Sequence, residues 1–254
     1  MTNALRIYTL ETKFEFLKQL RRPAYAIATI GIPIMFYAFF GLMSGIHNNG
    51  VSIATYLLAT YGTFGVVGAS MFGFGVSISM ERGAGWLLLK RASPMPPLAY
   101  FVAKIVTTTA FSALVVGLLF AMGALLGGVH LPALTWLALG SALIIGALPF
   151  CASGLALGYL ISPSAAVAVI NLINLPMSFI SGLWLPINLL PAAVQHIAPF
   201  LPAYHLGQLA LGTLGAATSP LPWYDHVLIL LAFTSAALSV AAIAYRRDEG
   251  ETYG

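Results

Sequence analysis

Between Lys104 and Gly127 the chain reads Ile105-Val-Thr-Thr-Thr-Ala-Phe-Ser-Ala-Leu-Val-Val-Gly-Leu-Leu-Phe-Ala-Met-Gly-Ala-Leu-Leu126. These 22 residues carry no charge, and they open a run of 120 uncharged positions that extends to residue 224. A helix needs about 20 mostly apolar residues to cross a bilayer, and a charge at its centre costs on the order of 2.5–3.5 kcal/mol. The stretch is therefore predicted to be a transmembrane helix.

The charged residues on either side of this run lie in three islands. Of the 18 Lys, Arg, Asp and Glu residues, seven lie in Arg6–Arg22, five in Glu81–Lys104 and five in Arg246–Glu251, which leaves only Asp225 elsewhere. Charged residues make up 7% of the chain, whereas they make up about a quarter of a soluble globular domain. The sequence therefore predicts an integral membrane protein that meets water at the islands.

Six apolar windows are long enough to cross the membrane, so the predicted fold is an all-α multi-pass membrane protein. With the N-terminus in the cytoplasm, six spans place all eleven Lys and Arg residues, and both termini, on the inner side of the plasma (inner) membrane. We expect one transmembrane domain over 1–254, divided into 1–23, the span region 24–245 and a cytoplasmic tail 246–254. The six windows are Ala24–Leu42, Ile53–Ser79, Ile105–Leu126, Leu134–Leu160, Ala165–Leu185 and His226–Tyr245.

The first island has the pattern of an amphipathic helix. Apolar residues at Ile7, Leu10, Phe14 and Leu17 alternate with charged ones at helical spacing, and Pro23 marks the break before the first span. This pattern is typical of a helix in the cytoplasmic interface with its apolar side towards lipid or protein. A simple basic anchor for the first span is the alternative.

Residues 186–225 are apolar but contain six prolines, so no window in them is long enough to cross. The pattern predicts two short helices, near Asn188–Ala198 and Ala203–Leu214, on the outer side. Irregular backbone exposed to lipid is not tolerated, so these helices are expected to dip back into the bilayer or to cover a cavity. A small outer domain is the alternative, although the segment has few polar residues.

The second island reads Met80-Glu-Arg-Gly-Ala-Gly-Trp-Leu-Leu-Leu-Lys-Arg-Ala-Ser-Pro-Met-Pro-Pro97. It predicts the end of a span, a glycine turn, a short helix over Trp86–Arg91 and a proline stop. Such a loop is suited to docking on a partner. Trp86 and Leu87 would anchor the contact, and the charged residues Glu81, Arg82, Lys90 and Arg91 would pair across it.

Three sets of motifs follow one another along the chain. The first are Arg21-Arg22-Pro23 at the end of the expected amphipathic helix, Gly31-Ile-Pro33 and Phe36-Tyr37. Stronger ones are Glu81-Arg82-Gly83 and Leu87-Leu-Leu-Lys-Arg-Ala-Ser-Pro94. The last are Ser181-Gly-Leu-Trp-Leu-Pro186 and Pro199-Phe-Leu-Pro202-Ala-Tyr204. In the order and spacing of these motifs, the whole chain resembles the permease subunit of type-2 ATP-binding-cassette exporters.

The resemblance implies a role for each segment. The loop at 81–93 looks like the coupling helix that enters a groove of a cytoplasmic ATPase, with Glu81, Arg82, Gly83, Trp86, Leu87, Lys90 and Arg91 as the contact residues. The segment after Gly182 looks like the outer re-entrant helices, with Ser181, Gly182, Pro186, Pro199 and Pro202 at the gate. Two permeases and two ATPases would form one transporter, so a homodimer is expected and a heterodimer remains open.

The sequence contains no Gly-x-x-x-x-Gly-Lys-Ser/Thr loop and no dinucleotide-binding glycine pattern. We therefore expect a transport subunit without catalytic residues, metal or cofactor of its own, with ATP and Mg²⁺ bound by the partner ATPase. The expected function is export of a lipophilic or amphipathic cargo by alternating access. A secondary transporter or channel is the main alternative and a membrane enzyme a weaker one. Lipid, cargo, ATPase and a second permease are the expected partners, and nucleic acid is not.

A few polar residues allow finer predictions. Asn171 and Asn174 share one face of the fifth window and would line the path or the dimer interface, although hydrogen bonding between helices explains them equally well. Asp225 is expected to cap the last span. Glycine pairs such as Gly154 and Gly158 would permit close helix packing. The five histidines, expected at the outer surface, are His47, His130, His196, His205 and His226.

Overall fold

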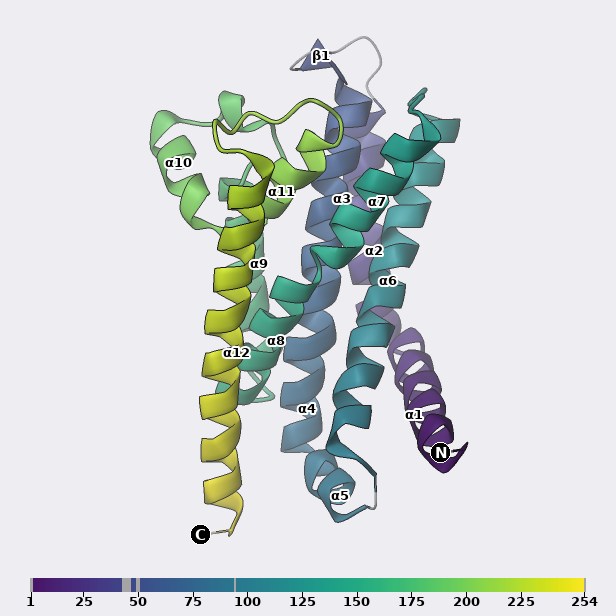
Figure 1. The fold of residues 1–254 in the computed structure, drawn as a ribbon, viewed down its shortest axis with the longest axis vertical. Helices are drawn as coiled ribbons and strands as arrows, with labels where there is room; N and C mark the ends of the chain where they lie inside the picture. Colours follow the sequence, from purple (N-terminus) through teal and green to yellow (C-terminus); the bar gives the residue numbers. More distant parts are fainter. Residues whose placement is uncertain (1, 43–46, 49–50, 94, 254) are drawn as a thin grey trace.

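The computed structural model describes residues 2–42, 47–48, 51–93 and 95–253 (Figure 1). Apart from two short paired strands, β1 (His47–Asn48) and β2 (Val51–Ser52), the elements of these residues are helices. In the first half they are α1 (Thr2–Leu20), α2 (Pro23–Phe36), η1 (Tyr37–Gly41), α3 (Ile53–Met71), η2 (Phe72–Val76), α4 (Ser77–Gly83), α5 (Trp86–Ala92) and α6 (Pro97–Leu125). In the second half they are α7 (Ala133–Ile145), α8 (Leu148–Leu160), α9 (Ala166–Ile180), η3 (Ile187–Leu189), α10 (Ala192–Ile197), η4 (Ala198–Phe200), α11 (Pro202–Gly212) and α12 (Trp223–Tyr253).

Four helices of the described chain are long and apolar enough to cross a membrane: Ile53–Gly83, Leu98–Leu125, Ala133–Leu160 and Trp223–Arg247. A fifth candidate is the pair Leu5–Leu20 and Tyr25–Gly41, whose axes meet at 83°. The fold is thus that of an all-helical multi-pass membrane protein with four or five candidate spans. The predicted window 165–185 is shortened to the 15 residues of α9, because the backbone turns at Gly182 with a φ of 74°.

The three charged islands gather at one end of the molecule, named here the charged end. Both termini and α5 lie there, whereas β1, α10 and α11 lie at the opposite end (Figure 1). The turn between α8 and α9 also belongs to the charged end, since Arg82 donates a hydrogen bond of 2.9 Å to the carbonyl oxygen of Ile161. This arrangement is the one that the distribution of basic residues predicts.

Helix α3 is the centre of the fold, and all but one of its residues are buried. It packs against α2, α6, α7, α8, α9 and α11. Small residues allow α8 to approach the segment η2–α4 closely. A Cβ atom on Gly154 would lie 2.9 Å from Cβ of Phe74, and one on Gly158 would lie 2.9 Å from Cβ of Ile78. The prediction that this glycine pair permits close packing is confirmed.

Two helices contain a π turn, and a third is broken near a proline. The π turn η1 follows Pro33 in α2, and η2 joins α3 to α4 through a hydrogen bond from the N–H of Ser77 to the carbonyl of Phe72. Helices α7 and α8 are separated at residues 146–147, just before Pro149 in the first turn of α8. Proline lacks an N–H and cannot continue the preceding turn, which explains that break.

Two predicted boundaries at the charged end are confirmed and one is corrected. The predicted N-terminal helix is α1, which ends at Leu20, and the next helix begins at Pro23. The predicted short helix is α5. Its turn depends on Gly85, whose φ of 73° favours glycine. Helix α6 begins at Pro97, eight residues before the predicted window, so Lys104 lies inside a helix rather than in a loop.

Candidate functional site

A group of charged and polar side chains is buried where α1, α4 and α6 meet at the charged end. The Lys104 Nζ atom donates to Glu15 Oε1 at 2.7 Å and to Glu81 Oε1 at 2.9 Å. It also lies 2.8 Å from Ser77 Oγ, and Lys18 forms ion pairs with both carboxylates. The phenol of Tyr100 donates to Glu81 Oε2 at 2.6 Å. The group, named here the buried ion cluster, consists of Glu15, Lys18, Ser77, Glu81, Tyr100 and Lys104.

The buried ion cluster is balanced in charge. Glu15, Glu81 and Lys104 are 4%, 5% and 1% exposed, so each has lost most of its water. Two carboxylates and two ammonium groups together replace that water with ion pairs and hydrogen bonds. Removing one member of a buried ion pair typically costs about 3–5 kcal/mol, because the other charge is left unpaired. The cluster therefore holds α1, α4 and α6 together.

Arg82 and Gly83 fix the next turn of the chain. The Arg82 guanidinium donates to the carbonyl oxygens of Tyr159 and Ile161 at the end of α8. Gly83 lies against the ring of Pro163, which a Cβ at this position would overlap. The end of α4 is thus bound to the α8–α9 turn on one side and to α1 and α6 on the other.

Helix α5 is attached to the protein by one face and exposed by the other. Lys90 forms an ion pair with Glu11 of α1 and lies 4.6 Å above the ring of Tyr100. Leu87 is buried with Ile78 and Tyr100. Three apolar side chains point outwards instead: Trp86 is 57% exposed, Leu88 44% and Leu89 69%.

The predicted docking residues therefore divide into two groups. Glu81, Arg82 and Lys90, which were expected to pair with a partner, satisfy their charges within the chain. Trp86 is exposed as a contact residue must be, whereas Leu87 faces inwards. Leu88 and Leu89 were not singled out from the sequence. The Arg91 side chain lies outside the described residues.

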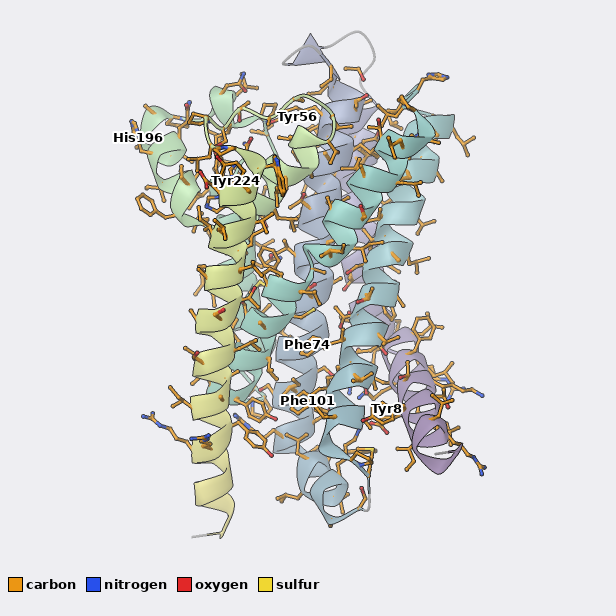
Figure 2. All side chains as sticks on the ribbon, viewed as in Figure 1. Tyr8, Tyr56, Phe74, Phe101, His196 and Tyr224 are labelled. Carbon is orange, nitrogen blue, oxygen red and sulfur yellow. The ribbon has the colours of Figure 1, made fainter. Side chains whose placement is uncertain are left out.

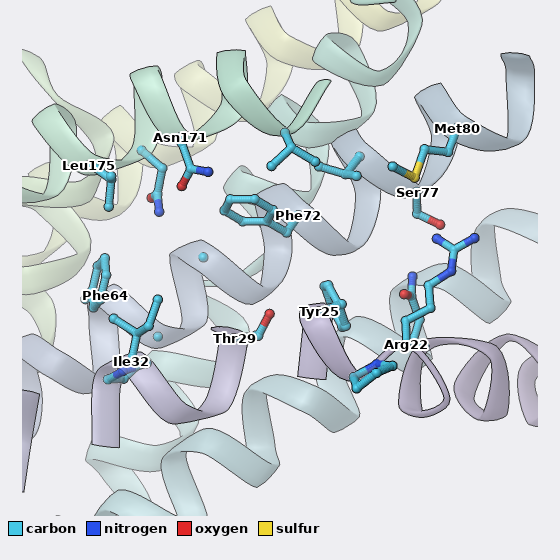
Figure 3. Close-up of a pocket in the computed structure, with 18 of the residues that line it drawn as sticks. Arg22, Tyr25, Thr29, Ile32, Phe64, Phe72, Ser77, Met80, Asn171 and Leu175 are labelled. Carbon is cyan, nitrogen blue, oxygen red and sulfur yellow. The ribbon is translucent and has the colours of Figure 1, made fainter. Parts of the chain in front are cut away.

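A cavity of about 690 Å³ lies between α1–α2, α3–α4 and α9 (Figure 3). Gln19, Arg21 and Arg22 line it at the junction of α1 and α2, together with Met80 of α4. Ser77 lies at the same end (Figure 3), and Pro23 also contributes to the lining. The rest of the lining is largely apolar and includes Tyr25, Thr29, Ile32, Pro33, Phe64, Gly65, Gly68, Phe72, Val76, Val167 and Leu175. The end of the cavity that Arg21 and Arg22 line is cationic and is named here its mouth, and the rest of the lining is largely apolar.

Both predicted asparagines line this cavity. Asn174 is 2% exposed and lies 3.5 Å from Ser178 Oγ through its Oδ1 atom, and Asn171 stands one helical turn away. Figure 3 shows Asn171 on the α9 side, facing the cavity across from Phe72. Their spacing of three residues therefore places both amides on the cavity side of α9.

A group of aromatic rings lies next to the end of the cavity that is remote from Arg22. The Trp184 ring lies 5.7 Å from that of Phe64, which lines the cavity, and 5.4 Å from that of Phe36. Phe179 and Tyr61 complete the group, and the Tyr61 hydroxyl donates to the Trp184 carbonyl at 3.0 Å. This group is named here the aromatic lid, and it reaches the cavity through Phe64, at the end opposite Arg22 (Figure 3). Its role could not be read from the sequence, because the rings come from four separate segments.

The predicted gate residues lie in the turns and short helices between α9 and α11. Ser181 and Gly182 form the turn after α9, and Pro186 begins η3. Pro199 lies in η4, where its carbonyl bonds to His205, and Pro202 begins α11. The two predicted short helices are confirmed as α10 and α11, at the end opposite α5 (Figure 1).

The prediction of surface histidines is wrong for two of the five. His205 and His226 are buried, with their Nδ1 atoms 2.7 Å apart, and His205 Nε2 lies 2.8 Å from the Pro199 carbonyl oxygen. Burial lowers the pKa of His205. The two histidines meet because α11 packs against α12. With 20 residues between them, this contact could not be predicted from the sequence.

The other polar predictions at the outer end stand as follows. His130 and His196 are exposed, as predicted, and the side chain of His47 lies outside the described residues. Asp225 lies in the first turn of α12, where a negative charge is favoured by the helix dipole. Figure 2 shows the outer position of His196 and of Tyr224, the residue before Asp225.

The candidate spans and the cavity between them define a multi-pass membrane protein with an internal binding space. The ABC-2 type transporter family matches residues 8–214, and the chain belongs to this family. A relative from Bacillus subtilis (strain 168), named "Putative transport permease YvfS", is 26% identical over 237 residues, which cover 92% of this chain and 95% of the relative. The protein is therefore a permease, the non-catalytic membrane subunit of an ABC transporter, and ABC-2 permeases generally pair with an ABC ATPase.

Proposed function

We propose that this permease exports a lipophilic or amphipathic cargo, driven by a separate ATPase that docks on α5. The observation that carries the proposal is the two-sided environment of α5. Its outer face presents Trp86, Leu88 and Leu89, and its inner face is bound to α1 through the Lys90–Glu11 ion pair. A helix that only connected two spans would not need exposed apolar anchors at the charged end. ATP and Mg²⁺ are assigned to the partner.

The contacts of α5 supply a route from the ATPase to the spans. A push on α5 acts on α1 through Lys90 and Glu11, and on α4 through the short turn at Gly85. The buried ion cluster then passes the displacement from α1 and α4 to α6. In this proposal the linked helices move as one body while the aromatic lid opens or closes the outer end of the cavity.

The arrangement of the spans supports alternating access. The cavity reaches the charged end at Arg21 and Arg22, and the aromatic lid covers its other end, as expected for an inward-facing state. In this proposal α2 with η1 and α9 serve as the first and fifth of six spans, with both termini cytoplasmic. Asn171 and Asn174 supply polar contacts to the cargo on the α9 side of the cavity.

A second permease copy completes the transporter in this proposal. Exposed apolar side chains lie on α2 with η1 and on α9, which contribute to the cavity lining. Among them are Ile27 and Phe39 on the first segment and Leu172 and Phe179 on the second. Pairing these faces across a two-fold axis would enclose the cavity between two subunits. One homodimer with two ATPases is the proposed assembly.

The test is co-purification of the ATPase from detergent-solubilised membranes of the source cell. A stoichiometric partner is expected, recognisable by its Gly-x-x-x-x-Gly-Lys-Ser/Thr loop. We expect the double variant Trp86→Ala/Leu89→Ala to weaken its binding by at least about 30-fold, because central aromatic and aliphatic anchors contribute about 2 kcal/mol or more.

The matched control for this test is Leu228→Ala/Leu231→Ala. It removes two equally exposed apolar residues from α12, whose side chains are 60% and 57% exposed, and it should leave binding unchanged. If no ATPase co-purifies with the wild-type permease, or if both double variants bind alike, the docking role of α5 is wrong.

A further inference from the structure

Two arginines at the mouth of the cavity differ from the other basic residues around them. Lys18, Lys90 and Lys104 form ion pairs, and Arg82 is held by carbonyl oxygens. For the side chains of Arg21 and Arg22, the described part of the chain supplies no hydrogen bond and no ion pair. Both nevertheless line the cavity.

The remaining lining contains no acid. Beside the two arginines, the polar groups of the cavity are uncharged amides, hydroxyls and a phenol, such as Gln19, Thr29 and Ser77. Figure 3 shows Arg22 at the same end of the cavity as Ser77 and Met80, with Phe64 and Ile32 at the other end. A ligand in this cavity therefore meets two uncompensated positive charges at one end and hydrocarbon at the other.

The positions of Arg21 and Arg22 are more specific than the orientation of the spans in the membrane requires. Basic residues that only set the topology of a span can lie anywhere in the adjoining loop, and Lys13 on the exposed side of α1 is of this kind. Arg21 and Arg22 instead lie at the 83° bend between α1 and α2, where the chain wraps the mouth of the cavity. Arginine is weakly hydrated and presents a planar set of donors that suits phosphate and carboxylate.

We propose that the cavity binds an anionic amphiphile, with its phosphate or carboxylate head group at Arg21 and Arg22 and its hydrocarbon chain between Phe64, Phe72 and Ile32. The proposal rests on the proposed function and names the chemical class of the cargo, which excludes cationic amphiphiles. Entry from the inner leaflet leaves the head group at the charged end while the chain fills the apolar part.

The test is binding of three twelve-carbon probes to the permease in phosphatidylcholine nanodiscs, corrected for partition into empty discs. Dodecyl phosphate is expected to bind about tenfold more tightly than dodecylphosphocholine or dodecyltrimethylammonium, and Arg21→Gln/Arg22→Gln should remove this preference. The control Arg246→Gln/Arg247→Gln removes two exposed arginines of α12 and should retain it. Equal binding of the three probes by the wild type, or equal losses in both double variants, overturns the proposal.

A second variant tests the apolar part of the site. Gly68 lines the cavity, and outside its own helix backbone a Cβ atom on it would have only the amide of Asn174 within 4 Å, at 3.8 Å, so the leucine of Gly68→Leu would take up space in the cavity. It should weaken dodecyl phosphate and dodecylphosphocholine alike, by about tenfold. Unchanged binding of both probes would place them outside the cavity and contradict the proposal.

A last experiment distinguishes transported cargo from phospholipid of the bilayer as the ligand of this site. If the site serves cargo, replacing part of the phosphatidylcholine by phosphatidylglycerol leaves the corrected affinity for dodecyl phosphate within about twofold. If phosphatidylglycerol competes with dodecyl phosphate for the wild-type site, and this competition disappears in Arg21→Gln/Arg22→Gln, the site binds bilayer phospholipid. That result overturns its assignment to cargo. If the probe tests fail while the ATPase still co-purifies, only the proposed class of cargo is wrong. If the probe tests succeed but no ATPase co-purifies, only the docking role of α5 is wrong.

Discussion

Replacing Lys104 by Met should lower the free energy of unfolding by about 3–5 kcal/mol. Methionine has nearly the length of lysine, so the change removes the charge with little change in packing. It leaves Glu15 and Glu81, which are 4% and 5% exposed, with Lys18 as their only cation in the buried ion cluster. Equilibrium unfolding of the purified permease in mixed micelles measures the loss.

Two further variants show whether this loss comes from the charge. Lys13→Met removes an exposed lysine from α1 and should leave the free energy of unfolding within about 0.5 kcal/mol of the wild type. Lys104→Met/Glu81→Gln restores the balance of charge and should recover a large part of the loss. If the double variant is less stable than Lys104→Met, charge balance is not what stabilises the cluster.

The second large effect is expected for Gly158→Leu. The Cβ atom of the new side chain would lie 2.9 Å from Cβ of Ile78 and 3.2 Å from the carbonyl oxygen of Gly75, so α8 would have to move away from η2 and α4. Overpacking of this kind costs about 3 kcal/mol. Because van der Waals packing is the main source of helix association in a membrane, the same unfolding measurement should register the full loss.

Gly117→Leu is the matched control for this effect. Gly117 is exposed on α6, and a Cβ atom on it would have no neighbouring atom within 4 Å, so leucine there meets only lipid or detergent. Its free energy of unfolding should equal or slightly exceed that of the wild type, since glycine is the weaker helix former. Equal losses for Gly158→Leu and Gly117→Leu would show that the α8 contact is not tight.

The helices could be predicted from the sequence wherever apolar length and charge determine them. Lipid excludes charge, so the end of the long helix that begins at Ile53 and the position of α5 follow from the residues alone. The start of α6 does not, because Lys104 resembles the end of a loop until Glu15 and Glu81 are known to neutralise it. Likewise the end of α9 depends on the backbone turn at Gly182, which local composition does not reveal.

The candidate site was predictable to a smaller extent. Asn171 and Asn174 reach the cavity together because a spacing of three residues keeps side chains on one helix face. The buried ion cluster joins residues up to 89 positions apart, and such pairings arise only from tertiary packing. One clue was present, however, since a lysine adjoining 120 uncharged positions must find a carboxylate or reach water.

The π turn η2 determines the direction in which the side chains of α4 point from the helix axis. An α-helix advances by about 100° per residue, and a π turn accommodates one additional residue without displacing the next turn. In an uninterrupted α-helix of the same sequence, Met80 would occupy the direction in which Glu81 now faces Lys104, and the carboxylate would be rotated away by about 100°. Removing one residue from Phe72–Val76 should therefore leave Glu81 directed towards Lys104. An insertion or deletion of one residue between Ser77 and Glu81 should turn Glu81 away from it.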